Sequence, residues 1–325
     1  MDKILVIKLG ALGDFIYAMG PMAAIRRAHP AAHITLMTTK PFANMARQSG
    51  YFNDILIDEK PKFYQVGAWL KLRNTLNDAQ FDRVYDLQNN DRTGFYLRLL
   101  SPRPEWVGAA KGASHRNTSA DRTKYHAYHG HAATLKLAGI EDIAIDPLNW
   151  MGEANQDNLQ SRLGLKKPLI LIVPGSSPQH PEKRWPVEHY RALCAKLIRQ
   201  GYHPTLIGTK AEADTTAQIA KGFDDVVNLT GQTSLDDLPA LARMAVGAIG
   251  NDTGPIHFIC VTGCPTLVMF CSQKSTIQKH GPQGARVKAL ESHDLAAIDP
   301  QRVFDEFCEL ALGELSSEKK SSKSA

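Results

Sequence analysis

A polar turn between two apolar stretches has the residue types needed to hold an anion. Residues 246–249 are typical of the buried end of a strand, and residues 256–261 have apolar side chains at helical spacing. Asp252, Thr253 and Gly254 lie in the turn, followed by a proline. Free N–H groups at the start of a helix favour an anion, and a proline there loses no hydrogen bond. The turn is therefore either an anion site or an ordinary helix N-cap.

A glycine-rich loop near the start of the chain is a second candidate site. Residues 4–7 are apolar, and the loop that follows contains Gly10 and Gly13 before a helical pattern begins. Glycines let the backbone turn sharply and leave the start of a helix open. The third glycine of the dinucleotide fingerprint is missing, so the loop gives little support to a nicotinamide site. From the residues alone, Asp14 at the end of this loop is a helix cap or a carboxylate placed for chemistry.

A third polar loop follows the apolar run 169–173. Ser176 and Ser177 have hydroxyls that suit phosphate oxygens, and Lys183 carries a charge that would neutralise a departing diphosphate. Glu212 lies in the first turn of another predicted helix, where a negative charge is favourable. From spacing alone, a plain surface loop explains residues 174–183 equally well.

Residues 89–131 contain a turn-rich loop followed by a series of basic side chains. Arg92 and Arg116 are the best candidates for binding, because a guanidinium matches a phosphate or carboxylate with two parallel hydrogen bonds. The stretch is either a solvated loop or a binding site for an anionic substrate.

Taken in order, these loops resemble glycosyltransferase family nine, the heptosyltransferases. The resemblance covers about residues 3 to 310. Each motif is short, and the ordered set is what makes the resemblance specific. The motifs are Gly10-x-x-Gly13-Asp14, Pro174-Gly-Ser-Ser177 with Lys183, Leu229-Thr-Gly231, and Asp252-Thr-Gly254-x-x-His257.

The resemblance implies an inverting transferase that moves a heptose from ADP-heptose to the anionic inner core of lipopolysaccharide. It implies no metal and no cofactor, and it gives Asp14 the role of general base. The implied donor-binding residues are Ser176, Ser177, Lys183, Glu212, Asp252, Thr253, Gly254 and His257. We assign Lys8, Arg92 and Arg116 to the acceptor.

The chain departs from the family pattern after the last strong strand. Many members continue with Phe-Gly-Pro-Thr, whereas this chain has Phe270, Cys271, Ser272 and Gln273. The resemblance therefore implies the class of donor and leaves its sugar open.

Two other functions fit the same motifs. A nucleotide-sugar epimerase can use the same fold, since fold does not fix function. A non-catalytic module that binds a sugar nucleotide is the other alternative. Donor turnover without acceptor would favour the epimerase, and tight donor binding without transfer would favour the module.

Composition limits the remaining classes. The net charge of +5 favours anionic partners, and no basic stripe interleaved with aromatics predicts a nucleic-acid site. Five scattered cysteines indicate free thiols in a reducing compartment. His257, Cys260 and Cys264 lack the paired spacing of a zinc knuckle. No signal peptide and no membrane span is predicted. We expect a cytoplasmic protein, with peripheral contact at the inner face of the inner membrane allowed by its lipid-borne acceptor.

The motifs must be positioned by strands that alternate with helices. Strands are predicted at 4–7, 34–38, 55–57, 83–88, 169–173, 203–207, 226–229, 246–249 and 266–270. This alternation predicts parallel α/β sheets, and the family resemblance implies the GT-B architecture of two Rossmann-like domains facing a cleft. The predicted parts are an acceptor-side domain at 1–150, a nucleotide-sugar domain at 165–313 and a disordered tail at 314–325.

Overall fold

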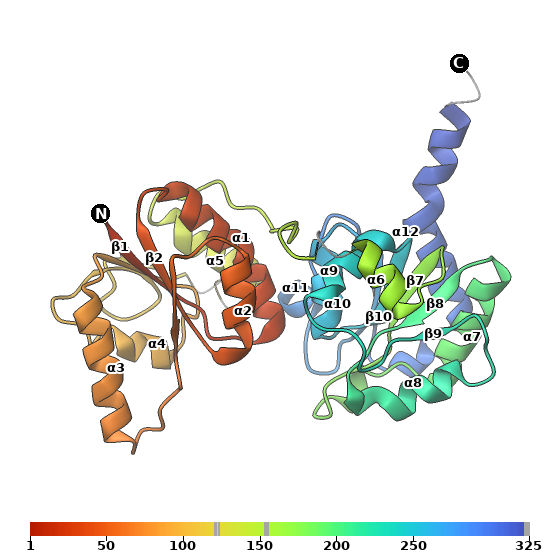
Figure 1. Cartoon of the computed structure of the whole chain (residues 1–325), viewed down its shortest axis with the longest axis horizontal. Coiled ribbons are helices and arrows are strands. Elements are labelled where there is room, and N and C mark those ends of the chain that lie inside the picture. Colours follow the sequence, from red (N-terminus) through yellow and green to blue (C-terminus); the bar gives the residue numbers. More distant parts are fainter. Residues whose placement is uncertain (120–121, 123, 153–155, 322–325) are drawn as a thin grey trace. The chain divides into compact units, whose positions relative to one another are not determined.

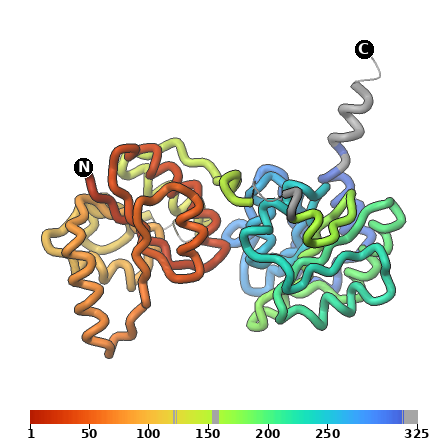
Figure 2. Tube along the Cα trace, viewed as in Figure 1, coloured from red at the N-terminus to blue at the C-terminus, as the bar shows by residue number. Residues whose placement is uncertain are grey.

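The computed structural model describes residues 1–119, 122, 124–152 and 156–321 (Figure 1). The chain divides into two compact units, Met1–Asp146 and Pro147–Ala325. It passes from one to the other through the segment that follows the last helix of the first unit (Figure 2). Each unit contains a six-stranded parallel sheet with helices.

The first unit is built on the strand order β3-β2-β1-β4-β5-β6. Strand β1 is central and buried, and Ile4 pairs with Ile34 on one side and with Arg83 on the other. The elements are β1 (Lys3–Ile7), α1 (Leu12–Ala28), β2 (His33–Thr38), α2 (Lys40–Gln48), β3 (Asp54–Ile57), α3 (Val66–Ala79), β4 (Arg83–Asp86), α4 (Asp91–Tyr96), β5 (Glu105–Gly108), β6 (His115–Arg116) and α5 (Ala127–Lys136).

The second unit has the order β12-β11-β10-β7-β8-β9. Its elements are α6 (Gln156–Leu163), β7 (Leu169–Val173), η3 (Pro181–Lys183), α7 (Val187–Arg199), β8 (His203–Leu206), η4 (Lys210–Glu212), α8 (Ala213–Ala220), β9 (Val227–Asn228), α9 (Asp237–Met244), β10 (Gly247–Asn251), α10 (Gly254–Val261), β11 (Thr266–Cys271), α11 (Ile277–His280), β12 (Val287–Ser292), η5 (Leu295–Ala297) and α12 (Pro300–Ser321).

The two sheets have the same topology. In each, the first three strands run to one side and the fourth returns to pair with the first. This is the doubly wound Rossmann order, in which ligands bind beyond the carboxyl ends of the strands where the winding reverses. The reversal lies between β1 and β4 in the first unit and between β7 and β10 in the second.

Continuous burial explains why the central strands were predictable. All five residues of β7 are buried, as are all five of β10. Strands covered by helices on both faces have continuous apolar runs. Strands β5, β6 and β12 were not predicted. They are short or half buried, so their sequences carry little of that pattern.

The C-terminal helix differs from the expected tail. Helix α12 continues to Ser321, whereas disorder was expected from residue 314. Glutamate, lysine and leucine in this stretch are good helix formers, and no proline interrupts them. Residues 322–325 of the expected tail lie outside the described part of the chain. Among the helices that are described, none is both long and apolar enough to cross a bilayer.

Candidate active site

A polar hollow lies at the switch point of the first sheet. It has a volume of about 170 Å³. Its walls come from the end of β1, the start of α1, the loop after β4 and helix α5. The lining residues are Lys8, Asp14, Leu87, Gln88, Asn89, Arg122, Ala127, Gly130, His131 and Thr134.

Asp14 lies in the first turn of α1, at the edge of this hollow. The N-cap residue Ala11 gives the helix no side-chain hydrogen bond, so an acidic side chain in the first turn is well placed. Gly10 has φ +124°, a conformation that L side chains rarely adopt, and an added Cβ would meet the Phe42 ring at 3.0 Å. Gly10 therefore sets the shape of the loop that leads into α1 and positions Asp14.

Lys8 is buried beneath the same hollow. Its Nζ lies 3.4 Å from His131 Nε2 and donates to the Leu87 carbonyl at 3.5 Å. Burial lowers the pKa of Lys8, against the opposing charges of Asp14 and Asp86. Burial, and then the charges of Lys8 and His126, hold the pKa of His131 well below its ordinary value. A neutral His131 can thus accept a hydrogen bond from the Lys8 ammonium.

Asp86, at the carboxyl end of β4, is completely buried close to this pair. Burial raises its pKa to about 6, although hydrogen bonds and Lys8 act against the shift. Its Oδ1 accepts from the backbone N–H groups of Gln88 (3.0 Å) and Asn89 (2.8 Å). Asp86 was not predicted from the sequence as a site residue, and His131 was predicted only as part of the basic stretch in residues 89–131. A polar residue directly after a buried strand was the signal available for Asp86.

The structure places the two predicted acceptor arginines away from this hollow. Arg92 donates from Nη1 and Nη2 to the Pro61 carbonyl, both at 3.2 Å, and lies 5.5 Å from the centre of the Trp69 ring. Arg116 is exposed on the short strand β6. Neither lines the hollow that contains Asp14, whereas Arg122 does.

A second hollow of about 220 Å³ lies at the switch point of the second sheet. It is formed by the loops after β7, β8 and β10 and by the start of α9. Its lining residues are Val173, Gly175, Ser176, Ser177, Ile207, Gly208, Thr209, Glu212, Thr233, Ser234, Leu235, Leu238, Thr253 and Pro255. An apolar wall with a few polar groups is typical of small-molecule sites.

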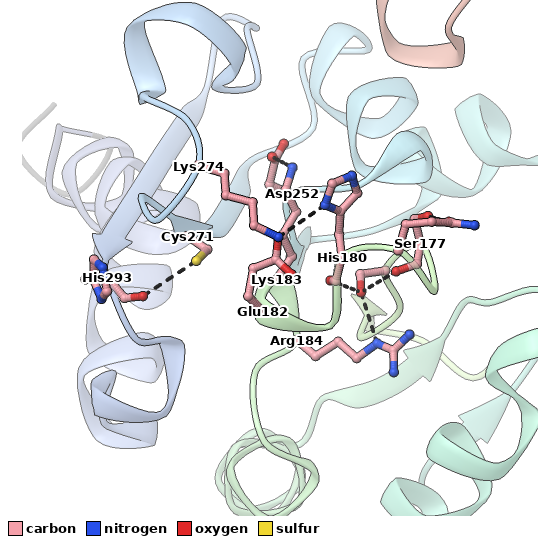
Figure 3. Close-up of polar contacts among 11 residues, drawn as sticks. Ser177, His180, Glu182, Lys183, Arg184, Asp252, Cys271, Lys274 and His293 are labelled. Carbon is pink, nitrogen blue, oxygen red and sulfur yellow. Dashed lines mark hydrogen bonds and ion pairs between the residues drawn. The ribbon is translucent and has the colours of Figure 1, made fainter.

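Asp252 and Lys183 form a short ion pair beside this hollow (Figure 3). Lys183 Nζ lies 2.6 Å from Asp252 Oδ2, and His257 Nε2 lies 3.5 Å from Oδ1. The Asp252 side chain is only 3% exposed. Burial acts to raise the pKa of Asp252, but His257 and Lys183 outweigh it and hold the pKa below its ordinary value. Three predicted donor residues from distant motifs therefore meet in one charged cluster.

The side chains of the turn do not act as an ordinary N-cap of helix α10. Thr253 is the N-cap of α10, yet its side chain makes no capping hydrogen bond. Asp252 bonds to Lys183 and His257. Gly254 begins the helix and a proline follows. The start of α10 is therefore uncapped by either side chain, which suits an anion.

Asn251 ties this turn to the loop after β7. Its Nδ2 donates to the Pro174 carbonyl at 2.7 Å, and its Oδ1 accepts from the Tyr190 hydroxyl at 2.9 Å and from Trp185 N–H at 3.3 Å. All four groups are buried, so each bond contributes to a fixed shape. Asn251 was not predicted from the sequence as a site residue, although it ends a buried strand.

The two serines differ in what their hydroxyls do. The buried Ser176 Oγ donates to the His180 carbonyl at 2.9 Å and accepts from Arg184 Nε at 3.0 Å. Ser177 is exposed and bonds to Gln179. Ser176 thus stabilises the loop, and Ser177 presents a hydroxyl at the hollow.

Glu212 caps a short helix and also lines the second hollow. Its Oε2 accepts from Thr209 N–H at 2.7 Å, which caps the short helix η4. The same carboxylate lines the hollow and packs against Gly175, where an added Cβ would lie 2.7 Å from Glu212 Oε1. Gly175 is therefore needed for this close approach.

The loop that departs from the family pattern is anchored on both sides. Gln273 donates to the His293 carbonyl at 2.8 Å, and Cys271 Sγ lies 3.6 Å from the same oxygen. Lys274 Nζ lies 2.9 Å from Glu182 Oε1, next to Lys183 in sequence (Figure 3). The hydrogen bond from Lys274 is the main reason why the pKa of Glu182 falls to about 2.

The cysteines near His257 behave as buried thiols. Cys260 and Cys264 are free and buried. Burial raises the pKa of both, to about 12 for Cys264. A cysteine binds zinc as the thiolate, whereas this buried setting favours the protonated thiol.

Two Rossmann-type units, each with a hollow at its switch point, are the architecture of the GT-B glycosyltransferases. The model of glycosyltransferase family 9 (heptosyltransferase) matches residues 69–303, and the chain belongs to this family and is a glycosyltransferase.

The similarity to known proteins extends over nearly the whole chain. Lipopolysaccharide heptosyltransferase 2 of Escherichia coli is 24% identical, over 96% of this chain and 99% of the relative. The structure of the E. coli ADP-heptose LPS heptosyltransferase II matches with a TM-score of 0.77 at 22% identity, covering 96% of this chain and 99% of that chain. The structure of E. coli heptosyltransferase WaaC with ADP gives 0.74 at 18% identity, covering 95% and 100%.

Proposed function

We propose that this protein transfers a heptose from ADP-heptose to the inner core of lipopolysaccharide, with inversion and without a metal ion. The names of similar proteins support this donor and this acceptor, and one of them has been solved with ADP. One observation carries the proposal. Asp14 lines one hollow, and groups that are suited to bind a diphosphate surround the other.

Asp14 acts as the general base in this proposal. It takes the proton from an acceptor hydroxyl, whose oxygen attacks the anomeric carbon of the donor. The bond from that carbon to the diphosphate oxygen breaks, and ADP leaves with the electron pair. A positioned base of this kind contributes about 10²–10⁴ in rate.

The second unit binds the ADP part of the donor. Lys183, the Ser177 and Thr253 hydroxyls and the uncapped start of α10 meet the diphosphate. Fixed cations and N–H groups stabilise the departing charge without a metal. Ser176, Asp252 and His257 hold these groups in place, and Glu212 contacts the nucleoside. We assign residues 1–150 to the acceptor side and residues 165–313 to the donor side.

The acceptor is anionic and borne by a lipid. Lys8 and exposed basic residues such as Arg116 suit its negative groups. We assign the enzyme to the cytoplasm, at the inner face of the inner membrane, where it would meet its lipid-borne acceptor.

The test is incubation with ADP-heptose and a series of truncated core acceptors, with mass spectrometry of the lipid product. The expected result is a gain of one heptose on one acceptor, formed about a hundredfold or more slowly by Asp14→Asn. Turnover of ADP-heptose without any acceptor would indicate an epimerase, and tight ADP-heptose binding without transfer to any core would indicate a binding module.

A further inference from the structure

An aromatic turn extends from the first unit between β3 and α3. Phe63 is 88% exposed and Tyr64 is 61% exposed. Val66 and Leu70, one helical turn apart on α3, are 65% and 53% exposed. Figure 1 shows this turn and the start of α3 at the outer tip of the unit. Single exposed apolar residues are ordinary, whereas a contiguous group of large ones marks an interaction surface.

The turn is held in shape by contacts of its own. The Lys62 carbonyl accepts from Gln65 N–H at 2.9 Å and from Trp69 Nε1 at 3.0 Å, and Gln65 Oε1 accepts from Lys62 N–H at 2.7 Å. Arg92 binds the Pro61 carbonyl and stacks near the Trp69 ring. The aromatic side chains at the tip are therefore presented by a built turn.

The charge of this segment has one sign. Residues 60–76 contain four basic side chains, Lys60, Lys62, Lys71 and Arg73, and no acidic one. Lys62 Nζ lies 5.9 Å from the centre of the Tyr64 ring, and Lys71 and Arg73 are exposed. Exposed aromatic and aliphatic side chains mixed with lysine and arginine are typical of surfaces that bind anionic lipid bilayers.

We propose that this surface docks on an anionic phospholipid membrane. We call it the tip patch, and it consists of Phe63, Tyr64, Val66, Leu70, Lys62, Lys71 and Arg73. The apolar side chains enter the boundary between headgroups and acyl chains. The basic side chains remain at the level of the phosphates, because their long stems allow the charge to stay in water.

The tip patch lies at the same edge of the first sheet as the proposed catalytic loop. Strands β1 and β3 are parallel, so the turn after β3 leaves the same sheet edge as the loop that carries Asp14. Lys60 Nζ lies 3.5 Å from the Leu9 carbonyl in that loop. Docking at this edge brings a lipid-borne acceptor toward Asp14, and this last step rests on the proposed function.

The docking itself is tested without any acceptor. The full chain is sedimented with vesicles of phosphatidylglycerol and phosphatidylethanolamine, and with vesicles of phosphatidylcholine alone, at low and high salt. We expect at least tenfold tighter binding to the anionic vesicles, weakened by salt because exposed charges are screened.

Two variants and two matched controls locate the surface. Phe63→Ser with Leu70→Ser, and Lys71→Glu with Arg73→Glu, should each weaken vesicle binding about tenfold or more. Leu137→Ser and Lys136→Glu change an exposed leucine and an exposed lysine on and after α5, outside the tip patch, and should bind as the parent does. Unchanged thermal unfolding verifies that each variant is folded.

The outcomes separate docking from catalysis. Equal binding to both kinds of vesicle, or full binding by the tip-patch variants, would overturn the proposal. The parent could instead form a dimer that Phe63→Ser with Leu70→Ser abolishes, with no vesicle binding. The surface would then be an interface between copies, which would also overturn the proposal.

If docking serves transfer, this variant should lose activity only on vesicle-embedded acceptor and keep it on a delipidated core oligosaccharide. Failure with both acceptors in the parent would count against the proposed function alone.

Discussion

Lys183 and Asp252 pair a partly exposed ammonium with a buried carboxylate. The Lys183 side chain is 23% exposed, so the same ammonium can also reach a ligand at the adjoining hollow. Asp252 fixes its position, and His257 supplies a second contact to Asp252. A cation held in this way is suited to an incoming diphosphate, since little side-chain freedom remains to be lost on binding.

Replacing Lys183 by alanine should weaken the binding of ADP and of ADP-heptose alike. The loss of one charge-assisted hydrogen bond costs about 1.5–3 kcal/mol, or roughly 10- to 100-fold in affinity. Isothermal titration calorimetry measures both. Lys183→Arg keeps the charge and should restore part of the affinity, and an unchanged ADP affinity in Lys183→Ala would place Lys183 outside the donor site.

Replacing Asp14 by asparagine or alanine should lower kcat about a hundredfold or more, with ADP affinity nearly unchanged. In the proposed mechanism the base acts on the acceptor hydroxyl, and Asp14 lies in a different unit from the proposed donor groups. Asp91→Asn is a matched control, because Asp91 is also an acid in the first turn of a helix of the same unit. Near-normal turnover in Asp14→Asn would remove Asp14 as the base.

At the scale of elements, strand ends bring the polar groups together. Lys8 follows β1, Asp86 ends β4, Gly175 lies just beyond β7 and Asn251 ends β10. Parallel strands deliver all their carboxyl ends to one edge of the sheet. Buried polar groups accumulate there, and the backbone N–H groups of the following loops compensate part of the cost of burying them.

Asp86, at the end of β4, should make the stability of the protein depend on pH. The pKa of Asp86 rises from 3.8 to about 6 on folding, so between these values the folded protein keeps a proton that the unfolded chain has lost. The free energy of unfolding should therefore fall on account of this group, by about 2 kcal/mol, as pH rises from about 4 to 6. Asp86→Asn should remove this contribution.

Denaturant unfolding of the parent and of Asp86→Asn, at a series of pH values, measures this effect. Asparagine keeps the Oδ1 acceptor for the two backbone N–H groups. The exposed Asp78→Asn in α3 serves as the control and should run parallel to the parent. Parallel profiles for Asp86→Asn as well would show that Asp86 does not titrate in this range in the folded protein.

At the scale of the whole molecule, the proposed function divides binding between the two units. The donor residues that the sequence indicated lie in the unit Pro147–Ala325, and Asp14 with the acceptor candidates lies in Met1–Asp146. On this proposal, changes in one unit should affect the binding of one substrate and spare the other.

Charge reversal at Arg116 should raise the KM for an anionic core acceptor several-fold and leave ADP affinity unchanged. The effect should shrink as salt rises, because exposed charges are screened beyond about 10 Å at 0.1 M ionic strength. Steady-state kinetics with both substrates varied, at two ionic strengths, measures it. Arg103→Glu, another exposed arginine of the same unit, is the control. Loss of ADP-heptose binding with unchanged acceptor KM would mean that the units are assigned the wrong way round.

The fold class and the family were available from the sequence because their signals are local. A buried parallel strand is a continuous apolar run, as in residues 169–173 and 246–249. A glycine-rich loop or a polar turn next to such a run keeps its spacing along the chain, as around Asp14 and Asp252. Short, half-buried strands such as β6 lack this pattern and emerged only in the sheet.

Tertiary structure decided which polar groups meet, since their partners are far apart in sequence. Lys183 and Asp252 are 69 residues apart, and Lys8 and His131 are 123 residues apart. Arg92 has a charge that suits an acceptor, yet its contacts with Pro61 and Trp69 support the turn of the tip patch. Exposure likewise cannot be derived from residue type: Phe63 is hydrophobic but lies in solvent, because the turn that carries it is closed by Lys62, Gln65 and Trp69. Residue types and local spacing thus determine elements and motifs, whereas long-range packing determines charge states, partners and surfaces.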